Sequence, residues 1–506
     1  MKKDIGRLGG ESLIYGLSTV AARLLTFLLM PFYTHYLPPA GYGVVAAVFS
    51  YIAFLNIVYH YGLDQSYMRH RSEDAGRNRA ALPAVGAGST ATGRAWSSSL
   101  ACLLASTAFL TLLMCLFPSA LAGLAGIGAD SGRLVLYAAA ILALDTLSLL
   151  PFAELRMRHK ALRYALVRTA SIALNVALNV YFLAFRGMGV EGVFLANILS
   201  SALSLLLLSD LLFSAMPSFD RGMARRLLSF ALPLLPAGLG AMAVQVIDRP
   251  IMLALSGEAA VGLYQAGYRL GIFMMLIVSM FDAAWRPFFL ERADKPEAPP
   301  VFARVLTYFT ALAAWTLVGV SLLIEDAVKA DLGGFSLIHP DYWAGLRIVP
   351  VVLAAYLLNG VYVNFLAPVI IAKRTGEILK VTLAGAAASV AANFLLIPPF
   401  GAMGAAAAAL LAYAVMAGLM YRAGRGLMQV PYEWGRLSRL AAVTCLFLAG
   451  HYAFGSGAHG PAAFGVKAAA ALLFPAALWL AGFFLPGEKA EAAALLSRFT
   501  RKKPAA

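Results

Sequence analysis

The stretch PFAELRMRHKALRYALVRTASIALNVALNVYFLAFRGMGVEGVFLANILSSALSL, residues 151–205, has a second version later in the chain: LAPVIIAKRTGEILKVTLAGAAASVAANFLLIPPFGAMGAAAAALLAYAV, residues 366–415. The positions that correspond are Pro151 and Pro368, Arg163 and Lys380, Asn179 and Asn393, and, across a two-residue insertion, Gly189 and Gly192 with Gly401 and Gly404. Two copies of one sequence pattern are expected to fold as two copies of one structural unit. The chain is therefore predicted to contain an internal duplication.

The duplication extends upstream in a fainter form. Gly41 and Gly43, after the first long apolar run, resemble the pair Val261 and Gly262 after the seventh. In that register Asp64 and Asp282 fall within one residue of each other, at the ends of the second and eighth runs.

The composition is that of an integral membrane protein. The 506 residues are 61% hydrophobic and 13% charged, with a mean hydropathy of +0.77, whereas soluble domains average about 25% charged residues. Apolar runs of about 20 residues match the length of a transmembrane helix. About fourteen spans are expected, at residues 12–36, 42–62, 96–117, 133–152, 164–185, 190–213, 230–254, 262–283, 304–324, 346–371, 380–398, 402–420, 440–454 and 463–485.

These spans group into an all-α architecture of two pseudo-symmetric lobes. Helices 1–6 form an N-lobe (1–213) and helices 7–12 a C-lobe (214–420), and helices 13–14 (421–485) and a basic tail (486–506) follow. Because each six-helix half begins on the same side of the membrane, the repeat is parallel, and a central cavity is expected between the lobes.

The net charge of +15 is a topology signal and does not indicate nucleic-acid binding. If the N-terminus is cytoplasmic, the inner loops and both termini hold 31 of the 40 Lys and Arg residues. The outer loops hold three, Arg133, Arg186 and Lys329. Positive charge concentrates on the cytoplasmic side, so both termini are predicted to be cytoplasmic.

A few spans carry charges deep inside the apolar run, namely Arg23, Asp145, Arg168, Asp248, Arg249 and Arg269. A charge in hydrocarbon costs a few kcal/mol or more, so such residues face a wet interior or one another. Lining of a transport cavity is the favoured interpretation, and structural pairing within the bundle is the alternative.

The heights of these charges suggest two specific pairs. At a rise of about 1.5 Å per residue, Asp248 and Arg269 lie at similar depth on adjacent spans, and so do Asp145 and Arg168. Arg23 lies near the middle of its span without a local acidic partner. Because a guanidinium binds phosphate or carboxylate groups bidentately, Arg23 is the strongest candidate for contact with an anionic ligand.

Prolines interrupt the first and seventh spans, at Pro31 and at Pro233, Pro236 and Pro250. Broken helices at corresponding places in two repeats are typical of transporter binding or moving elements. The chain has no GxxxxGK[ST], HExxH, GxSxG or CxxC motif, so neither an ATPase site nor a catalytic or metal site is expected. No cofactor is predicted.

Two stretches carry a family resemblance: GGESLIYGLSTVAARLLTFLLMPFYTHYLPPAGYGVVAAVFSY (9–51) and LLSFALPLLPAGLGAMAVQVIDRPIMLALSGEAAVGLYQAGYRLG (227–271), which continues through residues 284–288. They resemble oligosaccharide flippases of the Wzx type, in the polysaccharide-transporter branch of the MOP exporter superfamily, over about residues 10–485. The resemblance implies alternating access by two lobes around a cationic cavity in the bacterial inner membrane. The implied cargo is an undecaprenyl-diphosphate-linked oligosaccharide for surface polysaccharide, with other assembly proteins as potential partners.

In such a transporter Arg23, Arg168, Arg249 and Arg269 are the predicted substrate contacts. Transport in the family is implied to be coupled to protons or sodium, and the carboxylates available for coupling or for structural pairing are Asp64, Asp145, Asp248 and Asp282. The alternatives are lipid II flipping, MATE-like drug antiport, which would call for carboxylates where span 1 has arginine, and a membrane glycosyltransferase or polymerase.

Overall fold

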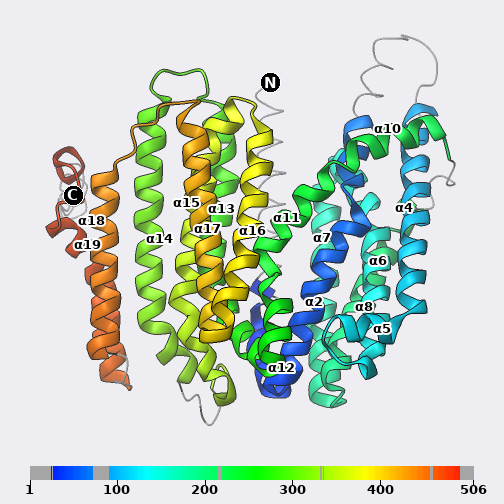
Figure 1. Cartoon of the computed structure of the whole chain (residues 1–506), viewed down its shortest axis with the longest axis horizontal. Helices are drawn as coiled ribbons and strands as arrows, with labels where there is room; N and C mark the ends of the chain where they lie inside the picture. Colours follow the sequence, from blue (N-terminus) through cyan, green and yellow to red (C-terminus); the bar gives the residue numbers. More distant parts are fainter. Residues whose placement is uncertain are drawn as a thin grey trace, which may run out of the picture. The chain divides into compact units, whose positions relative to one another are not determined.

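The computed structural model describes residues 24–25, 27–71, 90–212, 219–330, 333, 336–455 and 460–490, and within them all regular secondary structure is helical (Figure 1). Residues 27–36 and 63–71 are helical. The other elements are α2 (Pro39–His60), α4 (Thr90–Leu116), α5 (Pro118–Leu124), η1 (Ala129–Ser131), α6 (Gly132–Met157), α7 (Ala161–Val180), η2 (Tyr181–Phe185), α8 (Gly189–Leu207), α9 (Ser209–Leu212), α10 (Arg221–Ala231), α11 (Leu234–Val246), α12 (Asp248–Arg269), α13 (Ile272–Leu290), α14 (Ala298–Lys329), η3 (Pro340–Ile348), α15 (Val349–Ile371), α16 (Thr375–Phe400), α17 (Ala402–Arg425), α18 (Trp434–Gly450), η4 (His451–Gly455) and α19 (Pro461–Leu480).

Twelve helical segments of the described chain are long and apolar enough to cross a membrane. The chain is thus a multi-pass membrane protein of the predicted all-α class. The predicted number of fourteen spans is not confirmed. Most of the first span lies outside the described residues, and the thirteenth corresponds to α18, which has 17 residues and continues into the π-helical turn η4.

The predicted seventh span is broken, as its prolines suggested. The chain forms α10 and α11 on either side of Leu232 and Pro233, and α12 begins just before Pro250. Within α12 the backbone leaves helical geometry at Gly257, with φ 79° and ψ 176°. A positive φ at this reversal suits glycine, because it has no Cβ to clash with the backbone.

The two copies of the repeat share backbone details that support the duplication. Both α6 and α15 end in a left-handed residue, His159 at φ 55° and Lys373 at φ 56°. In each case the next N–H bonds back across the helix end, Lys160 to the Leu155 carbonyl and Arg374 to that of Val369, both at a donor–acceptor distance of 3.0 Å or less. This is the Schellman pattern of helix termination.

The second halves of the two copies also correspond. Gly189 and Gly401 have φ values of 56° and 54°; Gly189 is the first residue of α8, and Gly401 immediately precedes α17. The two-residue insertion falls where α7 passes into the π-helical turn η2, and a π-turn is the usual way in which a helix accommodates extra residues.

The chain divides into two compact units. Unit 1 comprises residues 1–272, 338–348 and 376–416, and unit 2 comprises residues 273–337, 349–375 and 417–506. One core of unit 1 packs helix 63–71 against α4, α6 and α10 through residues such as Tyr67, Trp96 and Leu227. A core of unit 2 packs α14 against α18 and α19 around Val318, Leu440 and Phe474. The lobe boundaries at residues 213 and 420 stay a prediction.

Candidate functional site

A buried ion pair occupies the start of α12 in unit 1. Asp248 and Arg249 are each only 5% exposed, and the Arg249 Nη1 atom lies 2.8 Å from the Asp248 Oδ1 atom. The two residues begin α12, which is separated from the end of α11 by one residue, Ile247, with helical dihedral angles (φ −67°, ψ −23°). Both side chains are buried, although adjacent residues on a regular helix point about 100° apart.

The remaining hydrogen-bonding groups of the pair are satisfied by neighbouring residues. The Arg249 guanidinium donates to the Gln265 side chain at 3.0 Å and to the Gln245 carbonyl at 2.8 Å. The Tyr264 hydroxyl donates to the other oxygen of Asp248. The ring of Tyr268 lies against the guanidinium, 4.1 Å from centroid to Cζ. A buried charge is tolerated only with such complete partnering.

Beside this pair, α12 crosses α2 with their backbones in contact. A Cβ atom on Gly43 would lie 1.8 Å from the Glu258 carbonyl oxygen, and one on Gly262 would lie 1.9 Å from that of Pro39. Only glycine permits such an approach. These are the glycines that the faint upstream repeat aligned, so the structure places repeat-related segments directly against each other.

The opposite face of α12 meets η3 in the same manner. A Cβ on Gly267 would lie 2.1 Å from the Gly345 carbonyl oxygen, and one on Gly345 would lie 2.1 Å from that of Leu263. We refer to Gly43, Gly262, Gly267 and Gly345 as the glycine crossing. The second half of α12 is therefore held on two sides by backbone contact rather than by interlocking side chains.

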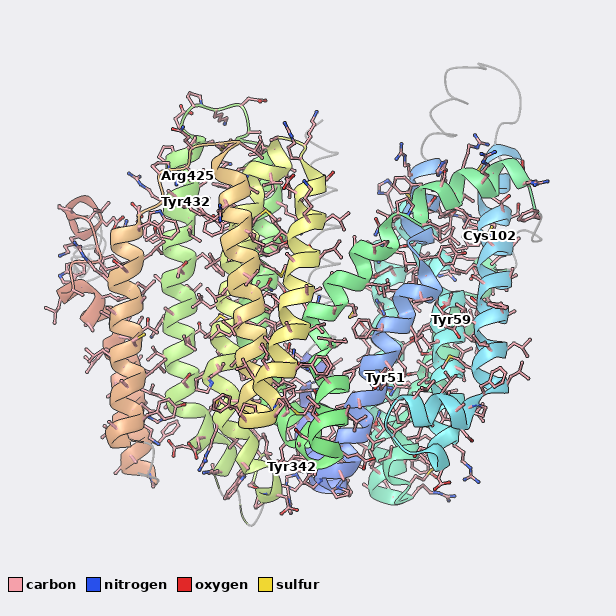
Figure 2. All side chains as sticks on the ribbon, viewed as in Figure 1. Tyr51, Tyr59, Cys102, Tyr342, Arg425 and Tyr432 are labelled. Atoms are coloured by element: carbon pink, nitrogen blue, oxygen red, sulfur yellow. The ribbon has the colours of Figure 1, made fainter. Side chains whose placement is uncertain are left out.

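Three tyrosines connect the crossing to its surroundings. The Tyr342 hydroxyl (Figure 2) donates to the Leu37 carbonyl at 2.8 Å, and the Tyr33 hydroxyl donates to Asn179 at 2.9 Å. Tyr42 packs between these two rings, 5.8 Å from Tyr33 and 5.9 Å from Tyr342 between centroids. The half-buried Arg269 interacts electrostatically with Tyr33 and Tyr42.

The predicted pair of Asp248 with Arg269 does not form, since Asp248 takes Arg249 and Tyr264 as its partners. The height argument considered only the depth of the charges, and it did not anticipate that Asp248 would pair with its neighbour in the chain, Arg249, at 2.8 Å.

Asp145 accepts a hydrogen bond from Ser201 at 2.7 Å, and Arg168 acts on it electrostatically. The guanidinium of Arg168 lies over the ring of Phe152, 5.4 Å from its centroid. In the described part of the chain no ion pair of 4.0 Å or less joins Asp145 to Arg168, so the predicted direct pair does not form, and Ser201 is the direct partner of the carboxylate.

The other predicted residues are not gathered at the Asp248–Arg249 pair. Asp64 is half-buried and interacts electrostatically with His60. Asp282 pairs with Arg286 one helical turn later, at 2.8 Å, on the partly exposed surface of unit 2. Arg23 lies outside the described residues. The roles of all the predicted substrate and coupling residues stay predictions.

An apolar pocket of about 500 Å³ lies beside α2 in unit 1. Tyr51 and Tyr59 of α2 (Figure 2) border it. Their hydroxyls bond within the protein, Tyr51 to the Ala125 carbonyl at 2.9 Å and Tyr59 to Thr111 at 3.3 Å. Because these polar groups are occupied, the pocket presents an almost wholly hydrocarbon lining.

Several buried charges were missed by the sequence analysis. Glu154, 4% exposed, binds Arg71 at 2.9 Å, Arg158 at 2.6 Å and the Tyr67 hydroxyl at 2.5 Å. In unit 2, Lys467 pairs with Asp326 at 2.6 Å with both side chains below 10% exposed. Lys467 was detectable, because it is a lysine inside the last predicted span.

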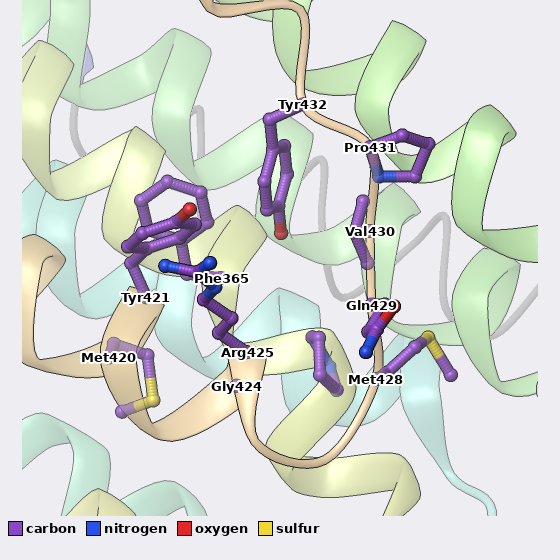
Figure 3. A pocket seen from close by; sticks show the side chains of 11 residues that line it. Phe365, Met420, Tyr421, Gly424, Arg425, Met428, Gln429, Val430, Pro431 and Tyr432 are labelled. Carbon is purple, nitrogen blue, oxygen red and sulfur yellow. The ribbon is translucent and has the colours of Figure 1, made fainter.

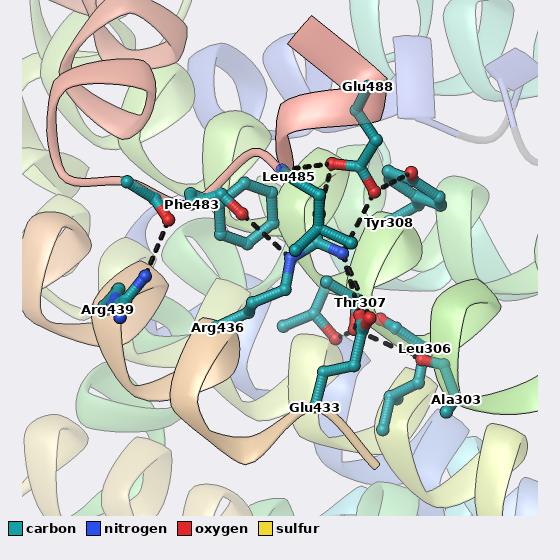
Figure 4. A network of polar contacts seen from close by, with 12 residues as sticks. Ala303, Leu306, Thr307, Tyr308, Glu433, Arg436, Arg439, Phe483, Leu485 and Glu488 are labelled. Carbon is teal, nitrogen blue, oxygen red and sulfur yellow. Dashed lines mark hydrogen bonds and ion pairs between the residues drawn. The ribbon is translucent and has the colours of Figure 1, made fainter. Parts of the chain in front are cut away.

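Arg436 forms the largest polar network of unit 2 (Figure 4). Its guanidinium lies 3.0 Å from Glu433 and 2.8 Å from Glu488, and its Nε atom donates to the Phe483 carbonyl at 2.8 Å. Thr307 and Tyr308 of α14 donate to the same two carboxylates. Burial opposes ionisation of Glu488, but the bond from Tyr308 and the charge of Arg436 outweigh it and lower the pKa of Glu488.

The chain was compared with known protein families and structures. A family model described as "Polysaccharide biosynthesis protein" matches residues 8–292. Among curated proteins, no sequence matches the chain.

Three solved structures illustrate the fold. A lipid II flippase, MurJ, in an inward closed conformation is 12% identical with a TM-score of 0.69, covering 93% of this chain and 98% of that one. An inward-facing multidrug resistance MATE family transporter of the MOP superfamily is 16% identical with a TM-score of 0.65, covering 83% and 96%. A MOP superfamily transporter from Pyrococcus furiosus, with a binding pocket of reverse polarity, is 17% identical with a TM-score of 0.55, covering 87% and 96%. At these identities the likeness establishes the fold.

Proposed function

Because this chain belongs to the polysaccharide biosynthesis protein family, we propose that it is a flippase that moves an undecaprenyl-diphosphate-linked oligosaccharide across the bacterial inner membrane. It acts by alternating access, with both termini in the cytoplasm, and it catalyses no covalent chemistry. The observation that carries the proposal is the Asp248–Arg249 pair, sealed among membrane-spanning helices beside the glycine crossing. A fully buried ion pair contributes little net stability compared with apolar packing, which favours a functional reason for its presence.

The pair suggests how cargo and ion are coupled. An anionic diphosphate and the Asp248 carboxylate compete for the same guanidinium of Arg249, because both are bidentate acceptors. A proton or sodium ion on Asp248 frees Arg249 for the diphosphate. Arg23, Arg168 and Arg269 supply further positive charge along the path, and Asp64, Asp145 and Asp282 are the other carboxylates available for coupling.

The helix contacts suit an element that moves. Glycines have no side chain to form directional bonds, so parting α12 from α2 and η3 breaks no side-chain bond at these four residues. The hydrocarbon tail of the lipid carrier occupies the apolar pocket beside α2, because the side chains that line this pocket are also apolar.

Translocation of defined lipid-linked sugars by the purified chain in proteoliposomes tests the proposal. The wild type is expected to move an undecaprenyl-diphosphate-linked oligosaccharide, and faster with an ion gradient. The triple variant Arg23→Ala, Arg249→Ala, Arg269→Ala is expected to lose this activity, whereas Arg133→Ala, 79% exposed in its side chain, is expected to keep it. Retained translocation in the triple variant would overturn the proposal that these arginines line the transport path.

The same assay tests two other candidate cargoes. The structural likeness to the lipid II flippase makes lipid II the second candidate, and the likeness to a multidrug resistance transporter makes a cationic dye the third. Movement of either one in place of the oligosaccharide would reassign the cargo. Lengthening of glycans without their movement would instead indicate a glycosyltransferase or polymerase.

A further inference from the structure

A pocket of about 400 Å³ in unit 2 belongs to none of the features described above. It lies where α15 and α17 end and where the segment 426–433 leads on to α18 (Figure 3). Its lining residues are Phe365, Pro368, Met420, Tyr421, Gly424, Arg425, Met428, Gln429, Val430, Pro431 and Tyr432.

The backbone fixes the shape of this pocket. The Gly424 carbonyl accepts hydrogen bonds from the N–H groups of Leu427 and Met428, both at 2.9 Å. These two bonds cap the C-terminal end of α17. The segment then runs back across the opening, with the Tyr432 N–H bonded to the Val430 carbonyl at 2.9 Å. Backbone hydrogen bonds thus shape this side of the cavity.

Aromatic rings make one wall. Phe365, Tyr421 and Tyr432 form a mutually packed cluster, with Phe365 5.5 Å from Tyr421 and 5.0 Å from Tyr432 between centroids. Trp434 extends the cluster, 5.2 Å from Tyr421, and is itself 50% exposed. Tyrosine and tryptophan gather at membrane interfaces, where one end of the ring system is apolar and the other is wet.

Arg425 is the one charged residue that lines the pocket. Its guanidinium lies beside Tyr421 and Phe365, and the side chain of Gln429 and the hydroxyl of Tyr432 also border the space (Figure 3). In the part of the chain that the structure describes, no carboxylate lies within 4.0 Å of the Arg425 guanidinium. The acidic residue closest in sequence, Glu433, is already held by Arg436 and Thr307.

These groups match one class of ligand. A guanidinium recognises a phosphoryl group by two parallel hydrogen bonds, amide and hydroxyl groups can bond its other oxygens, and the rings accommodate the adjoining apolar part. The positive-inside pattern puts the segment 421–439 on the cytoplasmic side, at the depth where lipid headgroups lie. We propose that this pocket binds the phosphoryl headgroup of a membrane lipid.

Two lipids present this chemistry: an anionic phospholipid of the cytoplasmic leaflet and a polyprenyl diphosphate carrier. Binding of a phospholipid would not depend on the transported cargo. Binding of the carrier would make the pocket a docking place before transport, and this second version rests on the proposed function.

The test compares binding to the full-length chain in detergent by native mass spectrometry and by thermal shift. The probes are phosphatidylglycerol, undecaprenyl diphosphate and, as the uncharged control, a diacylglycerol. Arg425→Gln removes the guanidinium. Arg422→Gln is the matched control, because Arg422 is exposed on the same turn of α17 and does not line the pocket.

Arg425→Gln is expected to weaken binding of a phosphoryl lipid about tenfold or more, the size of a lost charge-assisted contact, while Arg422→Gln changes it less than twofold. Tyr432→Phe keeps the ring and is expected to weaken binding about threefold, within the range of a neutral hydrogen bond. The lipid whose binding depends on Arg425 is the one whose headgroup the pocket binds. Equal binding of both lipids to the wild type and Arg425→Gln, or binding of diacylglycerol as tight as that of phosphatidylglycerol, would overturn the proposal.

If undecaprenyl diphosphate binds through Arg425 but the undecaprenyl-diphosphate-linked oligosaccharide is not translocated, the proposed function fails and the pocket stands. If the linked oligosaccharide is translocated equally well by Arg425→Gln, and undecaprenyl diphosphate shows no Arg425-dependent binding, the carrier version of the pocket fails and the flippase stands.

Discussion

The glycine crossing of unit 1 and the C-terminal hairpin of unit 2 hold their helices together in opposite ways. At the crossing, α12 touches α2 and η3 through backbone atoms at Gly43, Gly262, Gly267 and Gly345. In the hairpin, Lys467 of α19 forms an ion pair with Asp326 of α14, and the two carboxylates that bind Arg436 of α18 accept hydrogen bonds from Thr307 and Tyr308 of α14. Sliding a glycine contact breaks no directed bond, whereas parting an ion pair exposes charge to hydrocarbon.

These two kinds of helix contact indicate where movement is expected within each unit. In unit 1, the second half of α12 meets α2 and η3 through backbone atoms at the glycine crossing, and the Asp248–Arg249 pair lies at the start of α12. In unit 2, α18 and α19 are expected to move with α14 as one body. Four changes test this contrast.

The largest effect is expected from filling the crossing. In Gly262→Ala the new Cβ would lie 1.9 Å from a backbone oxygen, so α2 and α12 must separate, at a cost of about 3 kcal/mol or more. Thermal unfolding in detergent measures the loss. Gly319→Ala in α14 is the matched control, because its Cβ meets nothing within 4 Å. Equal stability of the two variants would show that the crossing is not tightly held.

Next in size is the charge at the start of α12. Asp248→Asn leaves Arg249 buried without its counter-charge, which is expected to cost about 3 kcal/mol. The double variant Asp248→Asn, Arg249→Gln is expected to recover part of this loss. Glu191→Gln, from a loose surface pair at 3.9 Å, is expected to change stability by less than about 1 kcal/mol. If the double variant is less stable than Asp248→Asn, the pair is not what stabilises this site.

A smaller and local effect is expected in the hairpin. Arg436→Met leaves Glu433 and Glu488 without a cation and is expected to loosen α18 and α19 from α14 by about 2 kcal/mol. Limited proteolysis of the segment 426–433 reports this loosening. Arg439→Met, one turn further along α18 and exposed, is the control. Similar cleavage rates in both variants would argue against an ionic clamp.

The smallest effect is expected when both members of a pair are removed. Lys467→Met together with Asp326→Asn is expected to lie within about 1 kcal/mol of the wild type, although Lys467→Met alone costs more. A double-mutant cycle by thermal unfolding measures the coupling. Additive losses would mean that the two charges do not support each other.

The sequence predicted the membrane class, the breaks at Pro233 and Pro250, and the correspondence of Gly189 with Gly401, which the structure finds with nearly equal φ values. Local chemistry decides these features, since a proline or a left-handed glycine acts on its own turn. The partner of Asp248 could not be predicted in this way. Counting residues gives the depth of a charge in the membrane, but it does not give the direction in which the side chain points.

Hydropathy, repeats and charge bias can be read directly from the sequence. They were sufficient to predict a duplicated, helical membrane protein with charges inside its spans. Only the tertiary structure decided which charges meet: Asp248 with Arg249, Glu154 with Arg71 and Arg158, Lys467 with Asp326, and Arg425 with no carboxylate among the described residues. The reason is physical. Some of these pairs join helices that are far apart in the chain, and for all of them, including the neighbours Asp248 and Arg249, the cost or gain depends on burial, which the packing of the helices sets.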